Sequence, residues 1–172
     1  MQKALFLDRD GVINIEKNYL YKIEDFEFID GIFDLCRFFQ KKGYKIFVVT
    51  NQSGIARGYY TQKDFDILTT WMIKEFKKEN IVINKVYFCP HHPNISGDCK
   101  CRKPNSGMFV DADNDFKIDF ENSVMIGDKQ SDIDAAHKVG IKETYLFNEK
   151  KDITNSDATK IVNNLYEIYK VK

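Results

Sequence analysis

The chain has 172 residues, enough for one domain with a sizeable core and too few for two ordinary domains. Its 26 basic and 26 acidic residues balance, so neither nucleic acid nor an anionic membrane is expected as a main partner. Apolar runs fall short of the roughly 20 residues that a membrane span needs, and we expect no signal peptide before the first strand. We therefore expect a cytoplasmic protein, and we expect it to be a monomer.

Five short apolar runs predict buried parallel strands. The runs are nearly continuous and rich in Val, Ile and Phe, as is typical of strands covered on both faces. They span residues 4–7, 45–50, 86–89, 123–127 and 144–147.

Amphipathic segments of helical period alternate with these runs. Thr61 and Asp64 have the spacing of a capping box, and Gly43 and Gly140 are plausible helix stops. Ser156 is expected to cap a last helix with Ile161, Leu165 and Ile168 facing inward. The other predicted helices span residues 31–42, 61–79, 106–116 and 131–139.

Strands that alternate with helices predict an α/β fold of the Rossmann-like type. We expect a three-layer α/β/α sandwich with a parallel sheet, in which residues 1–172 form a single domain without a separate cap domain. Two segments fit neither period, residues 14–30 and residues 90–104. Long irregular connections in a compact domain are usually functional, and both of these follow strand ends.

The first strand ends at two acids, Asp8 and Asp10, followed by a glycine. The carboxyl ends of strands line the ligand crevice of an open α/β sheet. Two carboxylates crowded there repel each other, so they require a divalent cation, a shared proton or a cationic partner. A polar turn is the alternative interpretation of the pair, because Asp and Gly are both turn residues.

Two further strands also end in polar clusters. Thr50, Asn51, Gln52 and Ser53 follow the second strand, and they suit a phosphate. The strand at 123–127 is followed by more carboxylates, which suit Mg²⁺ beside the first pair.

Within that later cluster, Asp128 could also cap a helix, and Lys129 could point to solvent. Asp132 has three possible roles: it could ligate the metal, contact the metal's ligands without touching the metal, or pair with a lysine.

Residues 89–104 carry a second constellation, which reads Cys-x-His, seven residues, Cys-x-Cys. Cys89, Cys99 and Cys101 with one histidine supply four ligands for a structural Zn²⁺ that staples the loop. Spacing alone leaves His91 and His92 as alternatives for the fourth ligand. The loop runs directly into two cations, so zinc would hold them over the phosphate crevice.

Together these motifs resemble the haloacid dehalogenase (HAD) superfamily of phosphotransferases. The resemblance implies that Asp8 is the nucleophile, Asp10 the general acid and base, and that Thr50 and Lys103 stabilise the transferring phosphoryl group. It also implies that Asp8, Asp128 and the carbonyl of Asp10 hold catalytic Mg²⁺, and it selects His91 as the fourth zinc ligand.

Among HAD enzymes, the zinc loop and the run from Thr50 to Gly58 resemble the D-glycero-D-manno-heptose 1,7-bisphosphate 7-phosphatases. The resemblance implies a small phosphorylated sugar as substrate, in the synthesis of activated heptose for lipopolysaccharide or other surface polysaccharide. The residues that it implies around the sugar and phosphates are Glu16, Lys17, Asn18, Tyr19, Asn51, Gln52, Ser53, Arg102, Lys103 and Lys129. Arg57 is a further candidate.

The near rival is a histidinol-phosphate phosphatase, which shares much of this motif set. A rival from another class is a non-catalytic zinc module that binds a partner, although the intact set of acids argues against it. Repair of a nucleic-acid terminal phosphate is a third alternative, and the chain lacks a basic or aromatic stripe for holding a strand.

Overall fold

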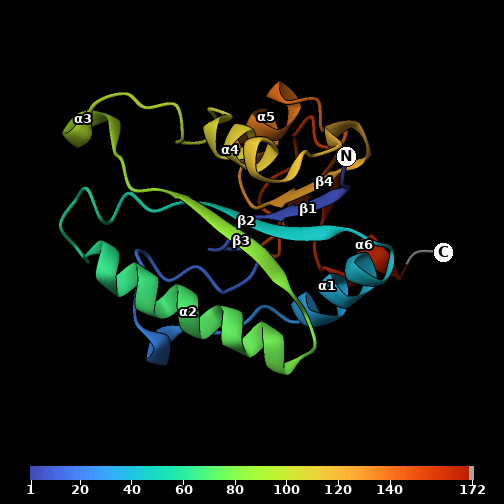
Figure 1. Cartoon of the computed structure of the whole chain (residues 1–172), viewed down its shortest axis with the longest axis horizontal. Helices are drawn as coiled ribbons and strands as arrows, with labels where there is room; N and C mark the ends of the chain where they lie inside the picture. Colours follow the sequence, from blue (N-terminus) through green and yellow to red (C-terminus); the bar gives the residue numbers. More distant parts are fainter. Residues whose placement is uncertain (171–172) are drawn as a thin grey trace.

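The computed structural model describes residues 1–170, and residues 171 and 172 of the predicted domain lie outside the described part (Figure 1). Parallel strands form one sheet in the order β3-β2-β1-β4-β5-β6. The strands are β1 (Ala4–Leu7), β2 (Lys45–Asn51), β3 (Ile83–Cys89), β4 (Val124–Gly127), β5 (Glu143–Phe147) and β6 (Lys160–Val162).

Helices cover both faces of this sheet (Figure 1). One face packs against α1 (Ile32–Lys41), α2 (Gln62–Lys78) and the short α6 (Tyr166–Tyr169). The other face packs against α4 (Gly107–Phe116) and α5 (Gln130–Lys138). The predicted three-layer α/β/α sandwich with a parallel sheet is therefore confirmed.

The two cores follow from the alternation of side chains along each strand. In β1, Leu5 and Leu7 enter the core beneath α1 and α2, whereas Ala4 and Phe6 enter the core beneath α4 and α5. The predicted capping box of α2 is also present: the Thr61 side chain accepts from the backbone of Asp64, whose carboxylate accepts in return.

The strand order places a topological switch point between β1 and β4. From β1 the chain moves outward through β2 to β3, and it then returns to β4 on the other side of β1. In open α/β sheets, ligands bind in the crevice at the carboxyl ends of the strands at such a point. The backbone N–H of Asp8 donates to the carbonyl of Ile126 at 3.1 Å, so the segments after β1 and β4 leave the sheet side by side.

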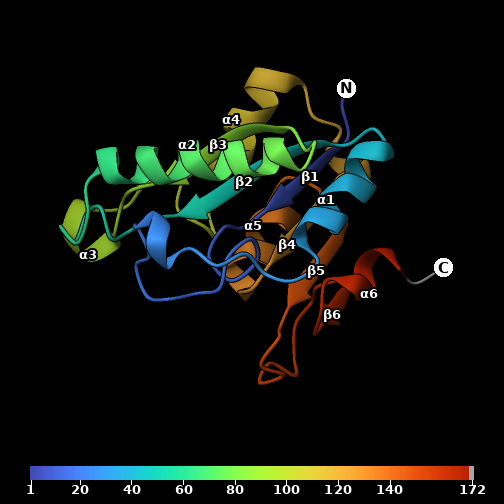
Figure 2. The same cartoon turned by 90° about the horizontal axis from the view of Figure 1, so that it is seen from below.

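The predicted last helix starting at Ser156 is wrong. Residues 160–162 form the edge strand β6, in which Ile161 lies opposite Leu146 of β5. From there to residue 170, the end of the described part, only α6 is helical. Pairing with the open edge of β5 gives the backbone N–H and C=O groups of this segment hydrogen-bond partners. A short isolated helix would form the same kind of bonds only marginally. Figure 2 shows that the connection between β5 and β6 extends away from the sheet. Ser156 instead donates to Gln130 at the start of α5.

The two irregular segments carry only short helices. They are the 3-10 turn η1 (Ile23–Asp25) and the four-residue helix α3 (Pro93–Ser96), and a second 3-10 turn, η2 (Phe120–Asn122), precedes β4. Within residues 1–170 these segments contain no larger element than η1 and α3. In the same range, no helix combines the length and apolarity that crossing a bilayer requires.

Candidate active site

A buried network of opposite charges lies at the switch point. The Lys103 ammonium stands 3.1 Å from Asp8 Oδ1 and 2.6 Å from Asp132 Oδ1, and it donates to the carbonyl of Val49 at 2.7 Å. Lys103 is only 3% exposed, so water screens these contacts little. Of the roles considered for Asp132, the structure shows the pair with a lysine.

Asp132 also shapes the turn after β4. Its second carboxylate oxygen, Oδ2, accepts from the backbone N–H groups of Asp128 and Lys129, each at 3.1 Å. These bonds fix the loop that precedes α5 and holds Asp128 beside Asp8. One carboxylate therefore holds the lysine with one oxygen and the loop with the other.

Negative charge exceeds positive charge at this point. Burial raises the pKa of Asp8 well above its ordinary value; the Lys103 ammonium opposes this rise, and the neighbouring carboxylates add to it. Burial, followed by the charge of Asp132, also raises the pKa of Asp128 to about 6. A cation among these carboxylates would relieve both effects.

The donor set fits a hard divalent cation. Carboxylate oxygens of Asp8, Asp128 and Asp132 lie within 4.8 Å of one another. Asp128 Oδ1 is buried without a hydrogen-bond partner among the described residues, as is expected of an oxygen reserved for a metal. A Cβ at Gly11 would stand 2.2 Å from Asp128 Oδ2, so glycine there leaves room for the carboxylate. All-oxygen donors of this kind suit Mg²⁺.

The carboxylate of Asp10 faces the crevice separately from this group. Oδ1 accepts from the Arg9 guanidinium at 2.9 Å and from Asn14 Nδ2 at 3.0 Å, and Oδ2 accepts from Gln52 Nε2 at 2.9 Å. The Asp10 side chain remains 17% exposed. Asp10 is thus held at three points while one edge stays open to a ligand.

Asn51 holds Lys103 in register with the end of β2. Its Oδ1 accepts from the backbone N–H of Lys103 at 3.0 Å, and its Nδ2 donates to the Lys103 carbonyl at 3.2 Å. Thr50 is buried beside it, and its hydroxyl accepts from Gln52 Nε2 at 2.9 Å. Two predicted ligand-binding residues, Asn51 and Gln52, thus engage neighbouring catalytic candidates.

A cavity of about 660 Å³ opens over this network. The cavity is lined by Asp8, Asp10 and Lys103. All predicted substrate-binding residues except Lys17 line it as well. Arg57, Tyr60, His92, Ser131 and Asp132 extend the wall. The structure thus brings together residues from four loops that are distant in the sequence. The predicted substrate-binding residues that line the cavity are Glu16, Asn18, Tyr19, Asn51, Gln52, Ser53, Arg102 and Lys129.

Lys17 stands apart from this set: its ammonium donates to the carbonyl of Asp25 at 2.9 Å and lies 3.3 Å from Glu27. Tyr60 also belongs to the site, because its hydroxyl donates to Gln52 Oε1. No sequence pattern marks Tyr60, because its contact depends on how the turn after β2 folds back over Gly54.

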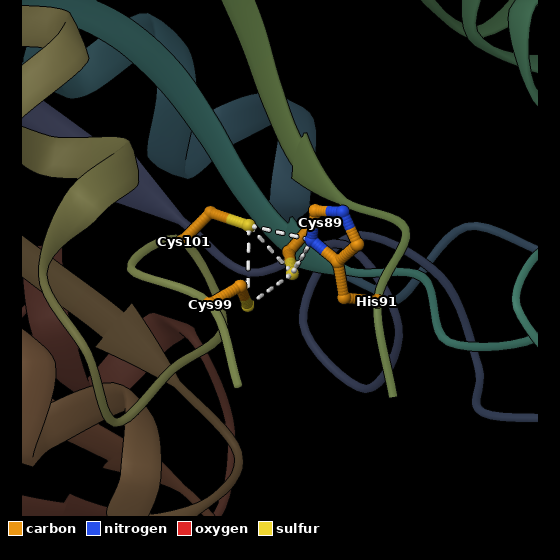
Figure 3. Close-up of side chains that lie close together, drawn as sticks. All are labelled: Cys89, His91, Cys99 and Cys101. Atoms are coloured by element: carbon orange, nitrogen blue, oxygen red, sulfur yellow. Dashed lines mark hydrogen bonds between the residues drawn. The ribbon is translucent and has the colours of Figure 1, made fainter. Parts of the chain in front are cut away.

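The four predicted zinc ligands converge (Figure 3). The sulfur of Cys101 lies 2.8 Å from that of Cys89 and 3.5 Å from that of Cys99, and His91 Nδ1 lies 3.3 Å from the Cys101 sulfur. The His92 ring points elsewhere, with its Nε2 2.8 Å from an Arg57 nitrogen. Three thiols and one imidazole nitrogen fit a tetrahedral zinc site, so geometry favours His91 over His92.

The zinc loop contacts the residues that line the cavity. The backbone N–H of Arg102 donates to the sulfur of Cys99 at 3.4 Å, and its guanidinium donates to the carbonyl of His91 at 3.4 Å. Because Arg102 directly precedes Lys103, the loop geometry sets the position of both cations at the crevice.

We expect Asp128→Asn to stabilise the metal-free protein at pH 7.5, by on the order of 5 °C in Tm. An acid whose pKa is raised on folding, here to about 6, costs stability above that pH. The cost fades as pH falls toward the unfolded value near 4. The gain should therefore shrink between pH 7 and pH 4, as thermal scans would show.

The same variant should lose the rise in Tm that Mg²⁺ produces in the parent protein, since a donor oxygen is gone. Asp66→Asn, an exposed change on α2, serves as the matched control and should respond to Mg²⁺ normally. An Asp128→Asn protein with an undiminished Mg²⁺ response would remove Asp128 from the metal site.

Comparison with known proteins gives a consistent result. Residues 100–168 match the HAD-hydrolase-like family model. The chain is 53% identical over 166 residues to a D-glycero-alpha-D-manno-heptose-1,7-bisphosphate 7-phosphatase of Campylobacter jejuni, covering 96% of this chain and 93% of that protein. It is 44% identical to the corresponding beta-anomer phosphatase of Haemophilus influenzae, covering 90% and 86%.

Among solved structures, the fold is similar to a D,D-heptose 1,7-bisphosphate phosphatase from B. bronchiseptica complexed with magnesium and phosphate. The TM-score is 0.85 at 25% identity, covering 98% of this chain and 96% of that one. These similarities extend over nearly the whole length of both chains.

Proposed function

Because the chain belongs to the D-glycero-D-manno-heptose-1,7-bisphosphate 7-phosphatases, a family of HAD-like hydrolases, we propose that it hydrolyses the 7-phosphate of that bisphosphate. It is an enzyme that acts on a phosphate ester. The observation that carries the proposal is the buried pair of Asp8 and Lys103 at the base of a cavity lined by further cations. The product is a sugar monophosphate for the synthesis of activated heptose.

In the first half-reaction, a carboxylate oxygen of Asp8 attacks phosphorus and the bond from phosphorus to the sugar O7 breaks. Asp10 gives its proton to O7, so the sugar leaves as an alcohol. In the second half, Asp10 takes a proton from water, and the water oxygen attacks the aspartyl phosphate. Inorganic phosphate leaves, and Asp8 returns as a carboxylate.

The surrounding groups stabilise charge on the transferring phosphoryl group. The buried Lys103 ammonium lies 3.1 Å from Asp8 Oδ1, and Thr50 adds a hydroxyl at the end of β2. Asp8, Asp128 and the carbonyl of Asp10 would hold Mg²⁺, which supplies Lewis-acid charge that offsets repulsion between the carboxylate and the phosphate. The buried free oxygen of Asp128 supports this assignment.

The retained phosphate needs cations in addition to Lys103. Arg102 and Lys129 are proposed to bind it, and a guanidinium can grip a phosphate with two parallel bonds. Burial disfavours the charge on Lys129, yet Asp128, Asp8 and Glu16 raise its pKa, so it stays an ammonium. Glu16, Asn18 and Tyr19 also line the cavity and are proposed to contact the sugar.

A substrate panel tests the proposal. Phosphate release with Mg²⁺ would be measured for the alpha and beta anomers of the heptose bisphosphate and for histidinol phosphate at equal concentration. We expect at least one heptose anomer to give a kcat/KM about 100-fold above that of histidinol phosphate, because only the bisphosphate engages both sets of cations. A preference for histidinol phosphate would favour the rival function instead.

We propose that Cys89, His91, Cys99 and Cys101 bind a structural Zn²⁺, which would cross-link the two ends of the loop. The matched variants His91→Ala and His92→Ala test this assignment by elemental analysis. His91→Ala should lose zinc, and His92→Ala should keep it, because only the former ring faces the thiols. Zinc retained in His91→Ala would exclude His91 as a ligand.

Loss of zinc should weaken substrate binding more than it slows chemistry. Because Arg102 is tied to the loop, we expect KM for the bisphosphate to rise about tenfold in His91→Ala. Mg²⁺ affinity should stay within about twofold, since the carboxylates lie on other loops. Unchanged steady-state kinetics in a zinc-free protein would contradict this role.

We also propose that the chain acts as a single-domain monomer in the cytoplasm, without a membrane or nucleic acid partner. A zero net charge and three clustered thiols, which a reducing compartment keeps available for metal, support this view. Light scattering of the zinc-loaded protein tests the oligomeric state, and a stable dimer at micromolar concentration would contradict it.

A further inference from the structure

The donors around the Asp10 carboxylate are unequally distributed. Two donors, from Arg9 and Asn14, occupy Oδ1, whereas among residues 1–170 only Gln52 donates to Oδ2. Each carboxylate oxygen offers two lone-pair directions. Oδ1 is therefore filled, and the remaining direction of Oδ2 is the one free to carry a proton toward a ligand in the cavity.

Gln52 is built into the protein rather than presented to solvent. It is 2% exposed, and its backbone N–H donates to the carbonyl of Cys89 at 2.7 Å. Its two amide hydrogens are both engaged, by Asp10 Oδ2 and by the Thr50 hydroxyl, each at 2.9 Å. Gln52 therefore orients protein groups, and its amide N–H groups are not available to a substrate.

An amide side chain can turn over, exchanging its NH₂ and its carbonyl oxygen, unless its surroundings distinguish the two ends. Here the Tyr60 hydroxyl donates to Gln52 Oε1. Burial raises the pKa of Tyr60 to about 12, so the phenol remains a donor at neutral pH. The hydroxyl thus anchors the carbonyl end and keeps the NH₂ end toward Asp10.

Tyr60 is itself fixed in place. Its ring stacks on Tyr21 with centroids 5.4 Å apart and planes 14° apart, and it lies directly before the capping residue of α2. A Cβ at Gly54 would come within 2.2 Å of the ring, so the turn accommodates Tyr60 only because residue 54 is a glycine.

We propose that Tyr60 and Gln52 are positioning residues that direct the proton of Asp10 into the cavity. The proposal deepens the proposed function and rests on Asp10 being its general acid. With the NH₂ of Gln52 facing Oδ2, protonated Asp10 finds no acceptor there and points its O–H at the leaving oxygen. If the amide turned over, the Gln52 carbonyl would accept that proton and hold it away from the substrate.

The test exploits the leaving group. Transfer from the heptose bisphosphate expels a poor alkoxide and needs protonation, whereas p-nitrophenyl phosphate expels a phenolate that is stable as an anion. kcat/KM reports only the steps up to this first transfer. We expect Tyr60→Phe to lower kcat/KM about tenfold for the sugar ester and less than about twofold for the aryl ester.

Tyr21→Phe is the matched control, because it removes a hydroxyl from the ring stacked on Tyr60 and should leave both values near those of the parent. Equal losses on both esters in Tyr60→Phe would mean general damage to the site and would overturn the proposal. No loss on either ester would overturn it as well. Thermal scans establish that each variant is folded.

A double-variant cycle gives a second readout that needs no aryl ester. Gln52→Met removes the amide through which Tyr60 is argued to act. Adding Tyr60→Phe to Gln52→Met should then cause no further loss on the sugar ester, and multiplying losses would contradict the proposal. If the parent protein ignores the heptose bisphosphate but cleaves another alkyl phosphate, the proposed function fails, and the same cycle on that ester still tests Tyr60.

Discussion

Asp8→Asn is expected to lower kcat by about 10⁴-fold or more while the protein stays folded. The amide is a far weaker nucleophile than the carboxylate, and no other carboxylate replaces it, because Asp132 is tied to Lys103 and Asp128 faces Asp8 from the next loop. The change also removes one of the crowded negative charges, so the Tm of the metal-free protein should not fall. Phosphate release and thermal scans measure both effects.

Two further variants serve as comparisons for Asp8→Asn. Asp66→Asn makes the same chemical change on the exposed face of α2 and should retain full activity. Asp10→Asn should be slowed strongly but less completely, because the nucleophile remains. Near-normal turnover by the Asp8→Asn protein would show that another group attacks phosphorus.

Lys103→Met should reduce both stability and turnover. The substitution leaves Asp8 and Asp132 buried with no cation between them, and breaking such a pair costs about 3 kcal/mol, or on the order of 10 °C in Tm. Turnover should fall by about 10²- to 10³-fold, because the charge on the transferring phosphoryl group loses its buried counterion.

A second substitution separates these two losses. Adding Asp132→Asn to Lys103→Met removes one of the stranded charges, so Tm should recover in part while kcat stays low. Lys142→Met, which breaks an exposed pair with Glu121, is the matched lysine control and should leave Tm within about 1 °C. A Lys103→Met protein as stable and as active as the parent would contradict the role of the buried pair.

The sequence predicted the site better than it predicted the far edge of the sheet, for a physical reason. Asp8 and Asp128 directly follow strongly apolar strands, and Thr50 lies in the last two residues of another. Parallel strands bring such residues to one edge of the sheet whatever the loops do. Ile161 and Leu165 fit a helical stripe equally well on paper. Only the open edge of β5, a long-range feature, decides that residues 160–162 pair as a strand.

The sequence does not predict which polar atoms at the ends of side chains contact each other. The sequence predicts that Asn51 and Gln52 bind phosphate. In the structure the Asn51 amide instead hydrogen-bonds the backbone N–H and C=O of Lys103, and the Gln52 amide donates to Asp10 and Thr50. The choice between His91 and His92 likewise depends on which ring faces the thiols, since consecutive residues leave a loop in different directions. Spacing fixes which residues share a loop, and only the fold fixes where their polar atoms point.

Asp8 is proposed to attack phosphorus beside a cation held by the loops after β1 and β4. The most direct measurement is a crystal structure of the zinc-loaded protein with Mg²⁺ and beryllium fluoride, a mimic of a transferred phosphoryl group. We expect beryllium bonded to a carboxylate oxygen of Asp8, and Mg²⁺ ligated by Asp8 and Asp128. Beryllium bonded to another residue, or Mg²⁺ found away from these two loops, would contradict it.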